Sequence, residues 1–356
     1  MTAPLLDDCA GRIARAAVAI SGFSADTFSQ AIRNVLTALP EDAQLEVFAE
    51  FAAQDRLLEW LEQAGRPTRS TIHSTPDGLN FSLWLQDALL IRRDGTAEIS
   101  PAFDRYDDLN LARHVVGALD LPVAEAAIPV DGGNVITHGR FAVLSADSGV
   151  EVEACRQFDP SRTVLPIGTS APCASEETRA TDRPMPGWRE TLNYLSKAST
   201  HQPIFHLDHM IAAAGHNGGT PRFLVGCPRS GAETAEHPMW PHAQPEAFDE
   251  IAQVLRDHGA DVIRNPQPLA WVDRPEQSYR RWFHLPVNNV LIDGSTVLLP
   301  CFANESWPEL AAVDEANTAL WQGLGFDVAP IPGMMQLAEA MGGPRCMVKV
   351  LERTPA

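Results

Sequence analysis

The chain has 356 residues, of which 45% are hydrophobic and 21% are charged, a globular composition with enough residues for a large core. Its formal charge of -19 argues against nucleic acid or an anionic membrane as partner and favours a small cationic ligand. No apolar run is long enough to span a membrane, and residues 1–8 lack the features of a signal peptide. The sequence therefore predicts a soluble, cytoplasmic protein.

The cysteines predict free thiols in a reducing compartment. They are scattered, with no Cys-x-x-Cys pair and no dense pattern of the kind found in secreted domains. The six positions are Cys9, Cys155, Cys173, Cys227, Cys301 and Cys346.

Residues 1–42 are expected to form a helical N-terminal extension. Gly11–Ile20 and Ser29–Leu39 both carry apolar residues at intervals of three and four, and Ser24 or Asp26 offers an N-cap. The extension contains no catalytic pattern, so we expect it to serve in packing or in contacts between subunits of a homo-oligomer.

Residues 43–356 are expected to form one α/β domain. A helix, a short strand, a loop and an apolar strand recur five times at intervals of roughly fifty residues, which predicts a repeat architecture with helices outside and loops converging on one axis. The expected helices are Asp55–Ala64, Asp108–Leu119, Trp188–Lys197, Phe248–His258 and Ala312–Gly323. Two long connections, 151–186 and 228–245, are candidate lids or disordered segments.

Polar residues interrupt the first two repeats. Asp87 follows Trp84, Leu85 and Gln86 in the apolar stretch Phe81–Ile91, which predicts a strand. A carboxylate there needs a cation or hydrogen-bond donors, although capping of a turn is an equal alternative. Asp131 precedes Gly132, Gly133 and Asn134, and an Asp-Gly pair is by itself more typical of a hairpin turn than of a functional site.

The third repeat contains the sequence from Phe205 to His209. In a strand over Pro203–Asp208, His206 and Asp208 would share one face and could address the same small ligand. A metal site involving His201, His209 and His216 is an alternative, although the spacing matches no common metal motif. A purely structural His–Asp pair is another.

The last two repeats contain Asn288, in an apolar strand expected over Trp282–Ile292, and a cysteine after a glycine loop. A buried amide needs hydrogen-bond partners, so Asn288 would either hold a neighbouring loop in place or orient a substrate. Gly342 and Gly343 allow backbone to pack closely around Cys346, which is either a small buried hydrophobe or a nucleophile.

Together these residues suggest covalent catalysis on a guanidino compound. Paired carboxylates suit the planar donors of a guanidinium group, and a thiolate suits attack on its electrophilic carbon. The sequence contains neither a phosphate-binding loop nor a dinucleotide-binding glycine pattern.

The same motifs, in the same order, resemble the pentein superfamily of guanidine-modifying enzymes. The segment from Gly342 to Met347 resembles the nucleophile loop of arginine deiminase, and His206 to Asp208 resembles its His-Leu-Asp motif. The segment Trp84–Asp87, the segment Asp131–Asn134 and the Asn288 strand are similar to motifs of the agmatine deiminase branch. Two positions depart from the family: Gln86 replaces its usual arginine, and Asp131 its usual glutamate.

The resemblance implies a five-bladed α/β propeller of pseudo-fivefold repeated ββαβ-type units. It implies a deiminase that acts through a covalent intermediate on Cys346, with His206 as acid and base and no metal or organic cofactor. Asp87 and Asp208 would hold the guanidinium nitrogens, and Asp131 would orient His206. The expected substrate-binding residues are Asp87, Asp208, Asn134, Asn288, Trp84 and Arg345.

The sequence leaves several alternatives open. An amidinotransferase would use the same first half-reaction with an amine in place of water, a non-enzymatic pentein would need no Cys346, and a metal hydrolase would hold zinc or iron. The sequence does not distinguish arginine, agmatine, a methylated arginine or a secondary-metabolite precursor as substrate. Arg280, Arg281 and Arg345 are candidates to meet a substrate carboxylate, with a surface or structural role as the alternative for each.

Overall fold

The fold was analysed in a computed structural model of the chain. It describes residues 3–100, 105–126, 128–146, 154, 158–170, 177–179, 187–192, 202–228 and 243–355. Cys155, Cys173, His201 and most of both long connections lie outside these residues, so their predicted roles are not addressed. Within the described part, no helix is long and apolar enough to cross a membrane.

Five small sheets share one strand arrangement. In each, the first two strands are antiparallel and the next is parallel. In spatial order the first sheet contains β20 (Val348–Thr354), β1 (Arg12–Ile20), β2 (Gln44–Ala49) and β3 (Ser70–Ser74). The others are β4 (Leu89–Ile91), β5 (Ala97–Ile99) and β6 (Val123–Glu125); β7 (Val135–His138), β8 (Phe141–Ser145) and β9 (Thr163–Ile167); β12 (Ile211–Asn217), β13 (Thr220–Cys227) and β14 (Asp261–Pro266); β17 (Leu291–Asp293), β18 (Thr296–Pro300) and β19 (Asp327–Ile331).

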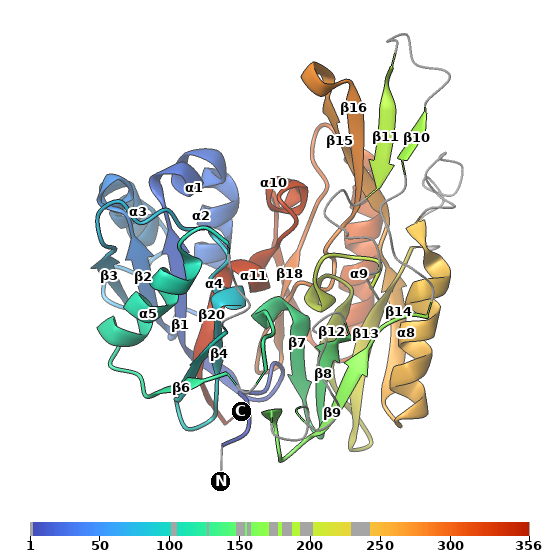
Figure 1. Cartoon of the computed structure of the whole chain (residues 1–356), viewed down its shortest axis with the longest axis horizontal. Coiled ribbons are helices and arrows are strands. Elements are labelled where there is room, and N and C mark those ends of the chain that lie inside the picture. Colours follow the sequence, from blue (N-terminus) through green and yellow to red (C-terminus); the bar gives the residue numbers. More distant parts are fainter. Residues whose placement is uncertain are drawn as a thin grey trace.

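A sixth sheet projects beyond the other five (Figure 1). It contains, in spatial order, β10 (Glu177–Arg179), β11 (Arg189–Leu192), β16 (Tyr279–His284) and β15 (Leu269–Arg274). Strand β11 shows that the helix predicted over Trp188–Lys197 is wrong where the structure describes it. None of the six sheets in the described part closes on itself.

The predicted N-terminal helix over residues 11–20 is also wrong, because these residues form β1. Its residues pack alternately into two separate cores: Ala16, Val18 and Ile20 into one, Ala17 and Ala19 into the other. A strand buried on both faces loses the polar alternation that identifies a strand in sequence. Since β1 pairs with both β2 and β20, residues 1–42 are not a separate helical extension.

Most helices lie where their apolar periodicity predicts. They cover the outer faces of the sheets, with α3 and α5 at one edge of the molecule and α8 at the opposite edge (Figure 1). Their bounds are α1 (Gly22–Thr27), α2 (Ser29–Ala38), α3 (Phe51–Gln63), α5 (Asp108–Ala118), α8 (Pro245–Asp257) and α9 (Ala311–Gly323). The short α10 (Met335–Glu339) precedes the cysteine loop.

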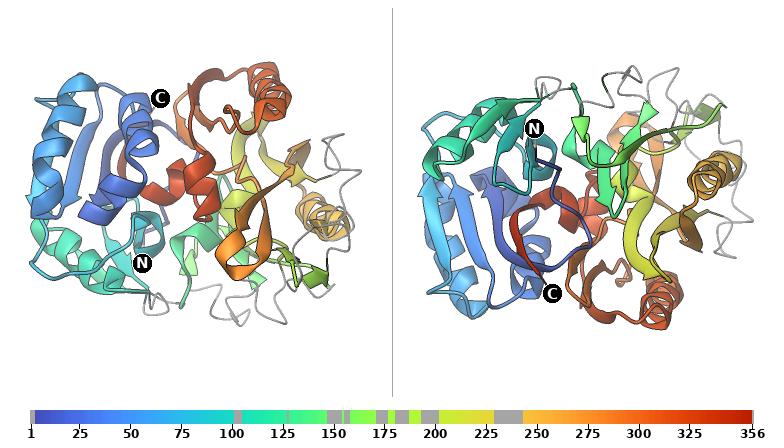
Figure 2. Two further views of the ribbon diagram at one scale, coloured as in Figure 1. Left: turned by 90° about the horizontal axis from the view of Figure 1, so that it is seen from above. Right: turned by 90° about the horizontal axis from the view of Figure 1, so that it is seen from below.

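Several inner segments expected to be strands are instead short helical turns. Within Phe81–Ile91, α4 (Leu85–Ala88) precedes β4, and within Pro203–Asp208 the chain bends into the 3-10 turn η3 (Leu207–His209). The turns η1 (Gly132–Asn134) and α11 (Pro344–Met347) lie beside them. Figure 2 shows the C-terminal turns, in red, between the N-terminal sheets and the later ones. These turns bring the predicted polar residues together.

Candidate active site

Cys346 lies in α11 and is held by Asn289. The thiol accepts a hydrogen bond from Asn289 Nδ2 (3.0 Å), and Asn289 Oδ1 accepts the backbone N–H groups of Arg345 (2.8 Å) and Cys346 (3.2 Å). A Cβ on Gly343 would lie 2.6 Å from Asn289 Oδ1, so only glycine allows this approach. The side chain of Cys346 is buried, with 2% of its surface exposed.

Asp208 lies beside the thiol and is fixed by Arg345. Its oxygens lie 3.7 and 4.0 Å from Cys346 Sγ, and Arg345 Nη1 donates to Oδ2 at 2.7 Å. Burial raises the pKa of Asp208, although the Arg345 guanidinium opposes this rise. Arg345 also donates to Asp8 at 2.9 Å and is itself buried. The expectation that Arg345 meets a substrate carboxylate is therefore wrong, because its donors are taken by two internal carboxylates.

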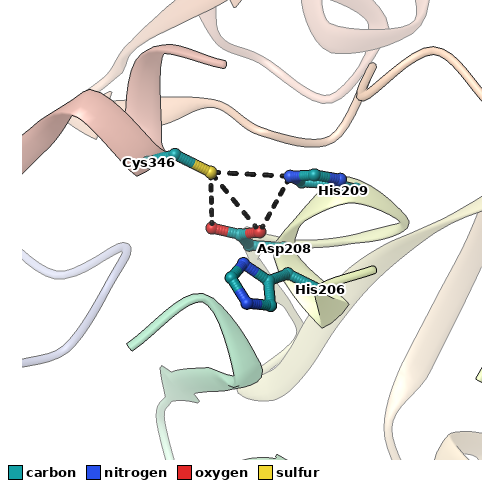
Figure 3. Close-up of side chains that lie close together, drawn as sticks. All are labelled: His206, Asp208, His209 and Cys346. Carbon is teal, nitrogen blue, oxygen red and sulfur yellow. Dashed lines mark hydrogen bonds and ion pairs between the residues drawn. The ribbon is translucent and has the colours of Figure 1, made fainter. Parts of the chain in front are cut away.

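His209 lies beside the thiol. Its Nε2 lies 3.5 Å from Cys346 Sγ and 3.7 Å from Asp208 Oδ1 (Figure 3). Burial lowers the pKa of His209 well below its ordinary value, so the ring is neutral at neutral pH. The sequence suggested His209 only as a metal ligand, because strand alternation would turn it away from Asp208. The η3 turn brings both side chains to the thiol.

His206 lies between two carboxylates. Its Nδ1 is 3.6 Å from Asp87 Oδ1 and its Nε2 is 3.6 Å from Asp131 Oδ2, both too long for hydrogen bonds. Burial alone would lower the pKa of His206, but Asp87, Asp131 and Asp208 outweigh it and raise the pKa. Its ring stacks on Phe205, with 4.0 Å between centroids. Neither ring nitrogen has a hydrogen-bond partner within the described residues.

Asp87 is buried in α4 and pairs with a residue that the sequence analysis missed. Its Oδ1 accepts the backbone N–H of Gly133 (3.1 Å), and its Oδ2 accepts from Arg105 Nη2 (3.1 Å). No pattern in the sequence relates Arg105 to Asp87. A Cβ on Gly133 would lie 2.4 Å from His206 Nδ1 and 2.9 Å from Asp87 Oδ1. The glycine therefore allows the carboxylate and the imidazole to approach each other.

Gln86, the first departure from the family pattern, braces the adjacent loop. Its Nε2 donates to the carbonyl of Gly132 (3.2 Å), and its Oε1 accepts from Lys349 Nζ (3.1 Å). Lys349 is buried on β20, and burial together with the Arg345 charge lowers its pKa to about 7. A glutamine and a lysine from opposite ends of the chain thus support the loop beside Asp87.

Two of the other expected substrate-binding residues have structural partners instead. Asn134 Oδ1 accepts the backbone N–H of Leu207 (3.2 Å), which ties η1 to η3. Asn288 Nδ2 donates to the carbonyl of Met210 (2.8 Å), and its amide pairs with Asn265. The neighbouring residue Asn289, and not Asn288, contacts the thiol.

Trp84 lines a cleft of about 670 Å³. A Cβ on Gly342 would lie 2.4 Å from the Trp84 ring, so the ring packs directly on the cysteine loop. The cleft is lined by Trp84, Arg105, Tyr106, Arg274, Arg281, Glu339 and Met341, among others. Arg280, the other predicted candidate for a carboxylate, pairs with Asp273 at 2.6 Å and does not line the cleft.

The site also contains a group of side chains that could hold a metal ion. Ligand atoms of His206, Asp208, His209 and Cys346 all lie within 4.8 Å of one another. Of the metal ligands suggested by the sequence, His209 belongs to this group, His216 packs on the ring of His138, and His201 lies outside the described residues.

Three solved structures resemble the chain along nearly its whole length. An agmatine deiminase from C. jejuni, with substrate bound, is 9% identical with a TM-score of 0.64, and the alignment covers 99% of this chain and 97% of that one. The agmatine deiminase of Enterococcus faecalis is 11% identical with a TM-score of 0.63, over 99% and 96% of the two chains. A candidate arginine deiminase from Porphyromonas gingivalis is 15% identical with a TM-score of 0.64, over 98% and 97%.

Comparison of sequences alone finds no relative: no family model matches the chain, and no curated protein is detectably similar to it. The three structures belong to the pentein superfamily. At such low identity the likeness establishes a shared α/β fold.

Proposed function

We propose that the chain is a deiminase that hydrolyses a guanidino compound through a covalent intermediate on Cys346. The observation that carries this proposal is the position of the thiol beside Asp208 and His209, with His206 held between Asp87 and Asp131. Its setting in the fold shared with solved deiminases supports the same chemistry. We further infer that the five similar sheets are the blades of a five-bladed propeller and that the loops at its axis form the site.

The first step is formation of the thiolate. Burial raises the pKa of Cys346 well above its ordinary value, and the carboxylates of Asp208 and Asp87 raise it further. A cationic guanidinium that binds against the same carboxylates would offset their negative charge and so lower the pKa of the thiol. The thiol would then lose its proton to solvent, so that the substrate helps to generate its own nucleophile, while the neutral His209 ring stays 3.5 Å from the sulfur.

The thiolate would then attack the guanidinium carbon. A C–S bond forms, His206 donates its proton to the leaving nitrogen, and the C–N bond breaks to release ammonia or an amine. Water next adds to the thiouronium carbon while His206 takes up its proton. The C–S bond breaks as the remaining hydroxyl proton passes to the sulfur, leaving a ureido product and the free thiol.

Two carboxylates would orient the substrate for this attack. Asp208 keeps Oδ1 available while Oδ2 pairs with Arg345, and Asp87 would contribute Oδ2. That oxygen accepts from Arg105, whose guanidinium resembles the group proposed to bind there. A substrate nitrogen would therefore compete with Arg105 for Asp87.

A panel of guanidino compounds tests the proposal. Arginine, agmatine and methylated arginines would be assayed for ammonia or amine together with ureido product, with and without amine acceptors. We expect a ureido product from at least one compound, lost in Cys346→Ala and kept in Cys301→Ala, which alters a half-buried thiol outside the site. Turnover by Cys346→Ala would contradict the mechanism, and product only with an amine acceptor would indicate an amidinotransferase.

A further inference from the structure

We propose that Lys349 is a site of reversible carbamate formation with CO₂ and that an internal cavity beside it holds the carbamate. The cavity has a volume of about 50 Å³. Its walls are formed by Lys349 together with residues of the N-terminal segment, α4, β4, β7 and the cysteine loop, among others. Lys349 takes no part in the proposed reaction, so this inference does not depend on the proposed function.

Only two residues of the chain are lysines. Of its 27 lysines and arginines, Lys197 and Lys349 are the lysines, and all the others are arginines. Lys197 lies outside the described residues, so Lys349 is the only lysine within them. An arginine stays protonated in a protein, whereas a buried lysine can lose its proton and react as an amine. Lys349 therefore offers a nucleophile that the arginines of the chain do not.

Lys349 is buried and makes a single hydrogen bond in the described part of the chain. The residue is 5% exposed, and its Nζ donates to Gln86 Oε1 at 3.1 Å. Burial and, after it, the charge of Arg345 lower the pKa of Lys349 to about 7, although Asp8 and Asp87 oppose this shift. At pH 7 about half of the molecules would therefore carry a neutral amine, roughly 10³-fold more than for a lysine with its ordinary pKa.

The cavity presents positive charge to an anion formed on Lys349. Arg345 and Arg353 also line it, together with the carboxylates of Asp7 and Asp8. Asp8 already accepts a hydrogen bond from Arg345 at 2.9 Å, and Asp7 accepts from backbone N–H groups. Within the described residues, Arg353 donates only to backbone carbonyls, at 2.7–3.1 Å, and pairs with no carboxylate. Because a charge shielded from water needs a partner, a carbamate would supply the counter-ion that Arg353 lacks there.

The size and the walls of the cavity suit CO₂ itself. About 10–15 Å³ of such space holds one water molecule, so 50 Å³ has room for a triatomic molecule and the carbamate that it forms. Apolar side chains, including Leu90, Val135 and Val290, favour an uncharged molecule over hydrated bicarbonate. Two other lining residues, Leu6 and Val350, are half-buried. They indicate access from the side where the N-terminal segment, in dark blue, passes beside the red C-terminal strand (Figure 2).

Carbamate formation needs no reagent besides CO₂ and involves no redox change. The lone pair of the neutral Lys349 amine adds to the carbon of CO₂, an N–C bond forms, and one C=O electron pair moves to oxygen. The nitrogen then releases one proton to solvent. The remaining N–H can still donate to Gln86 Oε1, while the new carboxylate carries one negative charge into the cavity lined by Arg345 and Arg353. Reprotonation of the nitrogen reverses the reaction and releases CO₂.

Trapping of the carbamate in the full chain tests the proposal without any need for turnover. The protein would be equilibrated with ¹³CO₂ at neutral pH, treated with triethyloxonium, which converts a carbamate into a stable ethyl ester, and digested for peptide mass spectrometry. We expect the labelled ester on the peptide that contains Lys349. The α-amino group of the chain also forms carbamates and is the positive control for trapping. Lys197→Arg is the matched control and should leave the Lys349 signal unchanged.

The charge of Arg353 provides a second test. Arg353→Met removes a cation that would pair with the carbamate, so the apparent affinity of Lys349 for CO₂ should fall about 10-fold. Arg66→Met is the control, because Arg66 is also buried and donates to backbone carbonyls but does not line the cavity. Wild-type protein trapped at the α-amino group and not at Lys349 would overturn the proposal. Equal losses of affinity in the two arginine variants would overturn the placement of the carbamate in this cavity.

Discussion

Two buried clusters of the molecule contain the same kinds of side chain but differ in what their polar atoms contact. The Cys346 cluster consists of Cys346, His206, His209, Asp208 and Arg345. The Asp7 cluster consists of Cys9, His138, Asp7 and Arg162. Each brings a thiol, an imidazole, a carboxylate and a guanidinium together in the interior.

In the Asp7 cluster the thiol, the imidazole and the carboxylate each bond to a backbone group. Asp7 Oδ1 accepts the N–H of Cys9 (2.9 Å), His138 Nε2 donates to the carbonyl of Gly215 (2.5 Å), and the Cys9 sulfur accepts the N–H of Gly215 (3.2 Å). Burial raises the pKa of Cys9 to about 12, so its thiol stays protonated. This cluster ties the N-terminal segment to β7 and β12.

In the Cys346 cluster, the thiol and the imidazoles lie against side chains. The thiol contacts Asn289, Asp208 and His209, and each ring nitrogen of His206 lies 3.6 Å from a carboxylate oxygen. Side-chain partners can be exchanged for a ligand without breaking a strand or a turn. The two clusters thus show that the partners of a cysteine and a histidine, more than their presence, distinguish a structural cluster from a candidate active site.

Replacing the two thiols should separate the clusters most strongly. Cys346→Ala removes the nucleophile, and we expect turnover of the guanidino substrate to fall at least about 10³-fold while the protein stays folded. Cys9→Ala should keep kcat within a small factor, with only a lower melting temperature. Steady-state kinetics and thermal unfolding measure both. Equal losses of turnover in the two variants would show that the two clusters do not differ in catalytic role.

Replacing the two histidines should give the next largest difference. His206→Gln removes the proposed acid and base, and kcat should fall by about 10²- to 10⁴-fold. Its effect on unfolding should be smaller than that of the matched change at His138, because the His206 ring makes no hydrogen bond within the part of the chain that the structure describes. His138→Gln breaks contacts to Asp7 and Gly215 and should lower stability with little change in kcat. A large loss of kcat in His138→Gln with little loss in His206→Gln would contradict the catalytic role assigned to the Cys346 cluster.

Gly133→Ala tests the close packing of the Cys346 cluster. The new Cβ would lie 2.4 Å from His206 Nδ1, so the ring must move, and a displacement of about 1 Å can lower turnover about 10²-fold. Gly117→Ala is the control: its Cβ would meet nothing within 4 Å, on α5, and the change should stabilise the protein by about 0.5–1 kcal/mol. Unchanged kcat in Gly133→Ala would show that the position of His206 matters little.

Asp7→Asn should affect stability alone, and in a pH-dependent way. Burial opposes the charge of Asp7, but His138, the Cys9 N–H and Arg162 lower its pKa from 3.8 to about 2. A lowered folded-state pKa stabilises the protein by about 2 kcal/mol above about pH 4, and this contribution is lost as pH falls towards 2. Denaturant unfolding should show wild type and Asp7→Asn converging over that range. A pH-independent difference would contradict the charge assigned to Asp7.

Apolar periodicity and the order of the motifs predicted much of this architecture from sequence. Helices α2, α5, α8 and α9 lie within a few residues of their predicted bounds. Strand β1 was missed because its alanine-rich sequence is buried on both faces. The segment around α4 was missed because an apolar run does not distinguish a strand from a short buried helical turn.

The site was predicted in composition but not in geometry. His206 and Asp208 do lie together, through the bend at η3 rather than through strand alternation. That bend also brings in His209, which a strand would have turned away. The sequence indicated Asn288 rather than Asn289. The reason is that β16 ends at His284 and β17 begins at Leu291, so strand alternation does not predict which side chains between them point inward. Arg105 pairs with Asp87 through a tertiary contact that no local pattern encodes.

The most direct test of the central claim, that Cys346 is a nucleophile beside a guanidinium site, is labelling with a haloacetamidine followed by peptide mass spectrometry. The reagent combines an amidinium cation with an electrophilic carbon, so carboxylates should guide it to the thiol. We expect a single adduct on Cys346, formed more slowly when a guanidino substrate is present, with Cys9 and Cys301 unmodified. An adduct elsewhere, or labelling of Cys346 that guanidino compounds do not slow, would contradict the account.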